Sequence, residues 1–424
     1  MRHIRIILVV IIVAAFTVPA LINANKFTRA NWVQSVGFAV DKNPAGFSAG
    51  GRLDSSNVES ASSILPDSIK LLIKKYNLKI WMKNYKPVVP SNGFIEATNR
   101  YYKQVKLTDT GNNARKKGIH NYVAGLPFPK PKNGLEVAWN YQYGYNGDDA
   151  DNDFAVYWIH AKRGVEKHEE WRWLYLMRAM HRTDIEPIPE IPKLAKKQIQ
   201  YYSMTVCKKP FDKKGFTALY YRVEKPLDQE GWIYIPAQRR ATRFSFGTRG
   251  DAWNNTDLLY EDVRGYMGYP EWMHWKIIGK GTFLAPMHSD IPYGKSNINK
   301  VYDFNNPPHW NFKANWEPRP MYVVEAKPKF RDYPYSRMIC YIDAENYYMM
   351  FKEAYDKKNQ LWKIVINAFN DSPDETRFPL TVGTSLVVDL HAEHATAFPW
   401  FSCKLNVGLD PDQFSLTSLR KLGR

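Results

Sequence analysis

Residues 337–369 read RMICYIDAENYYMMFKEAYDKKNQLWKIVINAF, and this stretch decides the fold. It contains three apolar runs separated by short polar connections, at 337–342, 347–355 and 361–369. In the last run Trp362, Ile364 and Ile366 share one face, opposite Lys363. Alternation of this kind predicts β-strands. Connections this short favour antiparallel neighbours, because a parallel pair needs a crossover of about a dozen residues or more.

The same period of two extends through the chain from about residue 200. Further strands are predicted at 217–223, 232–236, 275–283, 385–390 and 398–405. A long meander with one apolar face must cover that face by curling, by packing a second sheet, or by packing helices. We therefore expect a mainly β (α+β) fold with a large curled antiparallel sheet and a few helices packed against it.

Three segments carry helical spacing instead. Residues 66–76 begin with Pro66, which is favoured at the first helical position, and place Ile69, Leu72 and Ile73 on one face. Residues 94–105 and 257–267 also approach helical spacing. The sequence thus predicts three helices beside the sheet.

The N-terminus predicts export. Residues 1–24 have a basic start, an unbroken apolar run and small residues near the end, which is typical of a signal peptide. An uncleaved anchor is the alternative, since the apolar run is near the shortest that spans a bilayer. We expect residues 25–63 to form an extended arm, and 64–424 a single domain with Pro-rich insertions around 121–134 and 187–192.

The composition narrows the function classes. The chain has 424 residues, 59 Lys and Arg against 42 Asp and Glu, and a hydrophobic fraction of 44%. This fraction is too high for a disordered polymer, and three cysteines cannot frame a disulfide-rich mini-protein. A basic exported protein meets anionic phospholipids rather than nucleic acid, so the charge indicates attraction to an anionic membrane surface or serves solubility alone. We expect a periplasmic protein that can attach peripherally to the outer membrane.

The cysteines leave two alternatives open. Cys340 and Cys403 each lie in an alternating apolar segment, and Cys207 stands apart from them. They are either three free thiols, buried in the core, or include one Cys340–Cys403 disulfide, because sequence alone does not fix the pairing.

One acidic stretch and one histidine-containing stretch resemble metal-binding motifs but lack residues or spacing that those motifs need. Asp149, Asp151 and Asp153 alternate as in a calcium loop, but Phe154 stands where the loop needs Gly, so an exposed acidic turn is the better interpretation. His391 and His394 point to opposite faces of a strand and lack the i, i+4 spacing of a helical zinc motif. We therefore expect no metal site here and solvated histidines.

The sequence also offers no catalytic constellation. It has no G-x-S-x-G elbow, no Gly-rich phosphate loop after a strand and no Cys-x-x-Cys. We expect a protein without enzymatic activity and without a cofactor.

Aromatic side chains are unusually dense, with 14 Trp, 27 Tyr and 21 Phe. Core packing accounts for many of them, and the alternative is an apolar lumen on the concave side of the sheet that binds a lipid or another hydrophobic molecule. The predicted inward, ligand-binding residues are Trp232, Tyr234, Trp275, Ile277, Phe283, Met349, Phe351, Trp362 and Ile364.

Several short motifs occur in a recognisable order. They are NYVAGLPFP at 121–129, AWNY at 138–141, RTD at 182–184, IPAQRR at 235–240, WKIIGK at 275–280, QLWK at 360–363 and FSLTSLR at 414–420. Together they resemble the exported bacterial family named domain of unknown function 1329, over about residues 65–424. The resemblance implies a fold like the periplasmic lipoprotein carriers LolA and LolB, in which an antiparallel sheet wraps as an incomplete barrel about helices. It also implies association with an inner-membrane exporter of the resistance-nodulation-division (RND) type and an outer-membrane barrel, and it supplies no catalytic residues.

These observations lead to one expectation and two alternatives. We expect a periplasmic carrier that holds a lipid or similar hydrophobic molecule in an apolar lumen. The first alternative is an envelope adaptor with a filled core, and the second is an exported hydrolase.

Overall fold

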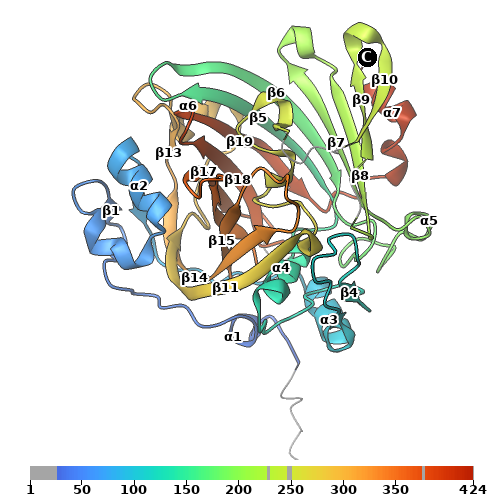
Figure 1. The fold of residues 1–424 in the computed structure, drawn as a ribbon, viewed down its shortest axis with the longest axis horizontal. Helices are drawn as coiled ribbons and strands as arrows, with labels where there is room; N and C mark the ends of the chain where they lie inside the picture. The colour runs from blue at the N-terminus through green and yellow to red at the C-terminus, as the bar shows by residue number, and fades with distance from the viewer. Residues whose placement is uncertain (1–25, 227–229, 246–250, 375–377, 424) are drawn as a thin grey trace, which may run out of the picture.

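The architecture is dominated by one sheet. The computed structural model describes residues 26–226, 230–245, 251–374 and 378–423, and within them fifteen strands form a single sheet (Figure 1). Its strands are β1 (Arg52–Leu53), β2 (Ile80–Met82), β5 (Ala150–His160), β6 (Gly164–Leu176), β7 (Ile199–Lys209), β8 (Thr217–Val223), β9 (Glu230–Ile235), β10 (Arg240–Ser245), β11 (Met273–Ala285), β14 (Asn315–Pro328), β15 (Arg337–Asp343), β16 (Met349–Tyr355), β17 (Leu361–Asp371), β18 (Leu380–Asp389) and β19 (His394–Leu405). Two small ribbons pair β3 (Lys106–Leu107) with β4 (Ile119–His120) and β12 (Tyr302–Asp303) with β13 (Asn311–Phe312).

The strand order shows how distant parts of the chain join in one sheet. The order is β1-β2-β14-β15-β16-β17-β18-β19-β5-β6-β7-β8-β9-β10, with β11 also paired to β14. Apart from the parallel β2–β14 contact, these strands pair antiparallel, and β19 pairs with β5 to join the last third of the chain to its middle. The two ends of the order do not pair, so the sheet curls without closing into a barrel. The expected mainly β fold with a curled antiparallel sheet is confirmed.

Helices cover the sheet at several places. They are α1 (Trp32–Ser35), α2 (Asp67–Tyr76), α3 (Asn92–Tyr101), α4 (Gly134–Tyr143), α5 (Pro192–Ala195), α6 (Ile298–Val301) and α7 (Leu416–Leu422). The predictions at 66–76 and 94–105 are confirmed by α2 and α3.

The helix predicted at 257–267 is wrong. This segment contains only one 3-10 turn, η6 (Tyr260–Asp262), and Arg264 and Gly265 follow with the left-handed φ values 60° and 106°. Its backbone carbonyls bind side chains of the sheet and of α4, as at Asp257 and Arg264, in place of the bonds within a helix. Tertiary contacts therefore override the apolar spacing that resembled a helix.

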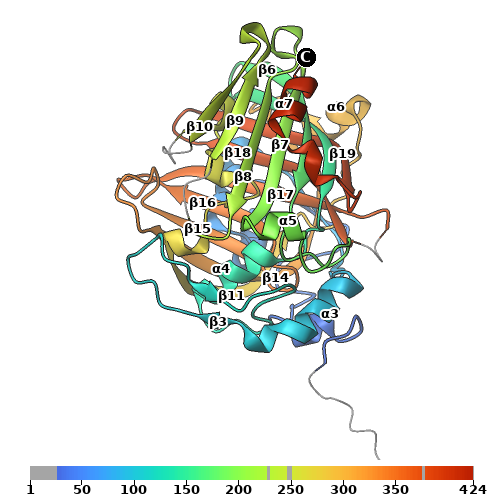
Figure 2. The ribbon, with the colours of Figure 1, turned by 90° about the vertical axis from the view of Figure 1, so that its right-hand side faces the viewer.

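Alternation along the strands divides the core into two layers. On the face that we call outer, α2 packs Ile69 and Ile73 against β14–β18, and α7 packs Leu419 against β7–β9. The opposite, inner face is covered by α3, α4 and residues 251–268, which we call the cover segment. Figures 1 and 2 show the sheet curving around this inner face, with α7 on the other side.

The N-terminal part of the described chain lies against the domain. The predicted signal, residues 1–24, lies outside the described residues. Within 26–63, α1 is followed by β1 and the 3-10 helix η1 (Val58–Ile64), and Trp32, Val36 and Val58 are buried. None of the helices in the described ranges combines the length and the apolar character needed to cross a bilayer.

Candidate functional site

An apolar cavity lies between the inner face of the sheet and the cover segment. It has a volume of about 130 Å³ and is lined by side chains from β5–β8, β16–β19, α4 and the cover segment. The lining is mainly aromatic and aliphatic, with Phe154, Trp173, Val365, Val387 and Trp400 among its members. A volume of this size is close to that of an apolar cavity that stays dry and admits one benzene ring.

Alternation on the strands builds the aromatic wall of this cavity. On β6, Trp173 and Tyr175 are two residues apart and stack with ring centroids 4.8 Å apart. Trp400 of β19 lies 5.8 Å from Trp173 and 5.1 Å from Phe154 of β5. Because side chains two apart on a strand share a face, three strands bring these rings together on one side of the sheet.

The cover segment is held on the sheet by buried polar contacts at its centre. Lys352 of β16 pairs with Asp262, and its Nζ also donates to Gly265 O at 2.6 Å. The Tyr335 hydroxyl donates to Asp262 Oδ2 at 2.6 Å. Lys352 and Asp262 are fully buried. Removing one partner of such a pair would leave the other charge uncompensated in the core.

Asp257 fixes the cover segment near its start. Its carboxylate lies 2.7 Å from His394 Nδ1 and accepts from the Thr396 hydroxyl at 2.7 Å, and its carbonyl accepts from Lys363 Nζ at 2.6 Å. His394 is thus a partly buried partner of Asp257, so the expectation that it is simply solvated is wrong. The cover segment is attached to β17 and β19 as well as to β16.

A smaller, polar cavity of about 40 Å³ adjoins the apolar one. The two share Asn146, Tyr175, Met177 and Arg264 in their linings. The smaller cavity is further lined by polar groups, which include Gln142, Arg178, His181 and Gln200. The apolar space therefore shares a wall with a polar one that carries Arg178 and Arg264.

Cys403 is a nucleophilic side chain at the cavity wall. Burial raises the pKa of its thiol to about 12, so the thiol stays protonated and unreactive at neutral pH. Cys207, Cys340 and Cys403 are all free thiols in the structure. The disulfide alternative for Cys340 and Cys403 therefore does not hold in this structure.

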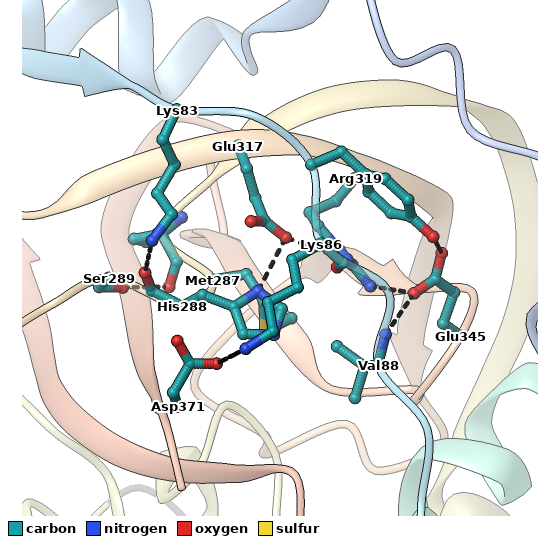
Figure 3. Close-up of polar contacts among 12 residues, drawn as sticks. Lys83, Lys86, Val88, Met287, His288, Ser289, Glu317, Arg319, Glu345 and Asp371 are labelled. Carbon is teal, nitrogen blue, oxygen red and sulfur yellow. Dashed lines mark hydrogen bonds and ion pairs between the residues drawn. The ribbon is translucent and has the colours of Figure 1, made fainter. Parts of the chain in front are cut away.

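A second cluster of titratable groups lies at the junction of β14, the loop at 286–290 and the segment at 83–88 (Figure 3). The Arg319 guanidinium binds Asp343 at 2.7 Å, Glu345 at 2.6 Å and Glu317 at 3.0 Å. His288 Nδ1 lies 3.0 Å from Glu317 Oε1. One buried arginine therefore faces three carboxylates, which is an excess of acid.

The protonation states of Glu317 and His288 reduce this excess of negative charge. Burial raises the pKa of Glu317 to about 8, against an opposing effect of Arg319. Burial, together with the positive charge of Arg319, lowers the pKa of His288 to about 3. At neutral pH Glu317 is therefore protonated and His288 neutral. Lys86 O and the Val88 amide also bind this cluster, which fixes the segment at 83–88 against the sheet.

The structure places the nine predicted inward residues on both faces. Trp275, Ile277, Met349 and Trp362 belong to the inner-face core, and Met349 lines the cavity. The other five lie on the outer face, so the expectation of one shared face is wrong for them: Trp232, Tyr234, Phe283, Phe351 and Ile364. A role of Met349 in binding stays a prediction.

β-Bulges explain three of these errors. An extra residue stands at Ile278, Met350 and Trp362, where the register with the neighbouring strand shifts. Because each bulge inverts the alternation beyond it, Phe283 and Phe351 turn away from Ile277 and Met349. The same shift separates Ile364 from Trp362.

Sequence reasoning missed the residues that form most of the cavity. Phe154 and Tyr175 lie on strands that were not predicted. Val365 lies on the face opposite to the one favoured, and for the predicted strand that holds Val387 no face was chosen. The available signal was the spacing of Trp171, Trp173 and Tyr175 at every second residue.

The acidic stretch at 149–153 has a structural role that differs from the expected exposed turn. Asp149 is buried, and its carboxylate accepts from the amides of Val407 and Leu409 at 2.7 and 2.6 Å. Asp151 binds Arg172 on β6. Among the described residues, no group of three or more His, Cys, Asp and Glu side chains is placed to hold a metal ion.

Fold and cavity together define a class of mainly β proteins in which an open, curled sheet surrounds an apolar space. A family model described as "Protein of unknown function (DUF1329)" matches residues 52–420, so the chain belongs to this family and the resemblance in sequence is confirmed. "Uncharacterized protein PA3922" of Pseudomonas aeruginosa is 24% identical over 371 residues, which cover 82% of this chain and 75% of that protein.

Two solved structures are also similar. A DUF1329 family protein from Desulfovibrio piger has 16% sequence identity and a TM-score of 0.47, with 68% of this chain and 97% of that chain covered. The LolA superfamily protein NE2245 from Nitrosomonas europaea has 13% identity and a TM-score of 0.40, with 67% and 96% covered.

Proposed function

We propose that this protein binds one hydrophobic molecule in the inner-face cavity and carries it, without catalysing a reaction. The observation that carries the proposal is the apolar cavity of about 130 Å³, lined by aromatic and aliphatic side chains and covered on one side by the cover segment. Each methylene that leaves water for such a site contributes about 0.8 kcal/mol, so apolar burial alone can hold a ligand.

The size of the cavity sets a condition on the ligand. The present volume accommodates one ring or a short hydrocarbon segment, whereas drug-sized ligands occupy roughly 300–1,000 Å³. A longer chain therefore needs side chains to move aside. Met177 and Met349 line the cavity and have flexible, unbranched side chains, which suits an adjustable wall.

The place of action follows from the sequence. The expected export signal at 1–24 would deliver the carrier to the periplasm, and the net charge of +17 would favour an anionic membrane surface. An RND-type exporter and an outer-membrane barrel are the partners that we propose for delivery and release.

Native mass spectrometry of gently purified protein tests the proposal. We expect the wild-type protein to retain a hydrophobic molecule, which lipid extraction then identifies. Val387→Phe adds bulk at a buried position in the cavity wall and is expected to reduce the retained fraction. Val165→Phe makes the same change at an exposed position on β6 outside the cavity lining and is the matched control.

Three results would contradict the carrier. A wild-type protein that arrives empty and binds no added hydrophobic probe would favour the adaptor with a filled core. Equal retention by Val387→Phe and wild type, with both folded by circular dichroism, would place the molecule elsewhere. Turnover of a lipid or glycan ester by the pure protein would favour the hydrolase.

A further inference from the structure

Arg264 stands at the boundary between the apolar and the polar cavity. It lines both spaces, and it belongs to the cover segment, which lies over one side of the apolar one. Its φ of 60° is a left-handed conformation that costs a non-glycine residue free energy and persists where the surroundings fix it. The Tyr141 hydroxyl, 3.0 Å from Arg264 O, supplies such a contact. The base of the side chain is therefore held in place beside the cavities.

The guanidinium of Arg264 has no acidic partner in the described part of the chain. No ion pair joins it to a described carboxylate, in contrast to Arg172 and Arg319. Burial raises the pKa of the Tyr175 phenol, and the nearby Arg264 guanidinium opposes this rise. An arginine thus lines an apolar, largely aromatic cavity on one side and a polar cavity on the other.

The other charged groups at this boundary already have partners. Arg178 donates to Tyr143 O at 3.0 Å and to Gly144 O at 2.7 Å. Asp262 is paired with Lys352, and Glu224 binds His181 at 2.7 Å behind the polar cavity. Arg264 is therefore the charged group at this boundary that is left to bind an anion.

We propose that the ligand is a long-chain carboxylate, whose head group binds Arg264 in the polar cavity and whose chain enters the apolar cavity. This inference rests on the proposed carrier function and specifies its ligand class. A polar space of about 40 Å³ suits a compact head group, since one water molecule needs roughly 10–15 Å³ by the same kind of measure. A guanidinium binds a carboxylate through two parallel, charge-assisted hydrogen bonds.

The test compares two ligands that differ only in the head group. Dodecanoate, below its critical micelle concentration, and dodecanol, below its solubility limit, are titrated into the full protein by displacement of an apolar fluorescent probe and by calorimetry. A charge-assisted hydrogen bond to a guanidinium predicts that the acid binds about tenfold to a hundredfold more tightly than the alcohol.

Variants assign this preference to Arg264. Arg264→Met is expected to lower the affinity for dodecanoate to that for dodecanol and to leave the affinity for dodecanol unchanged. Arg264→Lys keeps the charge and is expected to retain a preference for the acid. Arg337→Met, which removes an arginine at the start of β15 that does not line the cavity, is the matched control and should behave as wild type.

The outcomes separate this inference from the carrier function. Equal binding of acid and alcohol by the wild-type protein overturns the assignment to a carboxylate but leaves the carrier intact, and this comparison needs no variant. A preference for the acid that survives in folded Arg264→Met overturns the role of Arg264. Binding of neither ligand overturns the carrier function itself.

Discussion

Glu317→Gln is the most informative single substitution in the buried cluster of Figure 3. Glutamine has the shape of a protonated glutamate, and its oxygen can still accept from Arg319 and contact His288 Nδ1 as Glu317 Oε1 does. Because the native state already holds Glu317 protonated at neutral pH, we expect the variant to fold and to be about as stable as wild type near pH 6.

The pH dependence gives the expected magnitude and its sign. The folded state raises the pKa of Glu317 from the ordinary 4.5 to about 8. Between these values the folded protein holds a proton that the unfolded chain has released, so this contribution to stability is complete below pH 4.5 and is lost as the pH rises towards 8. The loss is about 1.4 kcal/mol for each pH unit, or at most about 5 kcal/mol over the interval.

His288 acts in the opposite direction at lower pH. The folded state lowers its pKa from 6.5 to about 3, so its contribution to stability falls as the pH decreases from 6.5 to 3. Between pH 4.5 and 6.5 the two contributions change the free energy of unfolding with pH in opposite directions and cancel. The wild-type protein is therefore expected to lose stability from this pair only above about pH 6.5 and below about pH 4.5.

Urea unfolding monitored by circular dichroism at half-unit steps from pH 5 to 8.5 measures the effect. The free energy of unfolding of Glu317→Gln minus that of wild type should increase with pH up to about 8 and then level off. Glu325→Gln, on the same strand but paired with Lys327 at the surface, is the control and should show a constant difference. A constant difference for Glu317→Gln would refute a protonated Glu317.

Three further predictions concern the cover segment, the cavity and the outer layer. Lys352→Met leaves Asp262 buried without its cationic partner and is expected to lower the free energy of unfolding in urea by about 3–5 kcal/mol. The double variant Lys352→Met with Asp262→Leu should recover most of this loss. The control, Lys358→Met at an exposed position, should have no effect. Cys403, with its pKa raised to about 12, should react with iodoacetamide at pH 8 far more slowly than glutathione, and a comparable rate would contradict the raised pKa. Ile73→Ala removes a buried contact between α2 and the sheet and should cost about 2–5 kcal/mol, whereas neighbouring Lys74→Ala should change the free energy of unfolding by less than about 0.5 kcal/mol.

The strands at 337–369 could be predicted because local information determines them. Their connections are short, their apolar residues alternate, and each pairs with its neighbour in sequence. β5 was missed because the sheet buries parts of both of its faces, which removes the alternation: Val156 and Ala155 are both fully buried. A strand buried on two sides gives a continuous apolar run rather than a period of two.

The cavity could not be located from the sequence for a related reason. A bulge such as the one at Met350 moves every later side chain of the strand to the opposite face, and no residue type marks a bulge reliably. The cover segment depends on distant partners, since Asp262 and Lys352 are 90 residues apart. Aromatic density indicated that an apolar cavity was worth considering, but register decided which side chains line it.

The position of the cavity ties ligand binding to the completion of the sheet. Phe154 of β5 and Trp400 of β19 pair across the strand contact that joins β5–β10 to β14–β19. The lining draws on both parts, so the cavity exists only once this contact has formed. A ligand that binds there stabilises the joined state, by about 2.7 kcal/mol at a hundred times its dissociation constant. The cover segment, in contrast, is attached by side-chain contacts to Asp257, Asp262 and Arg264, so under the proposed carrier function it is the part that can move off the cavity while the β5–β19 pair stays intact.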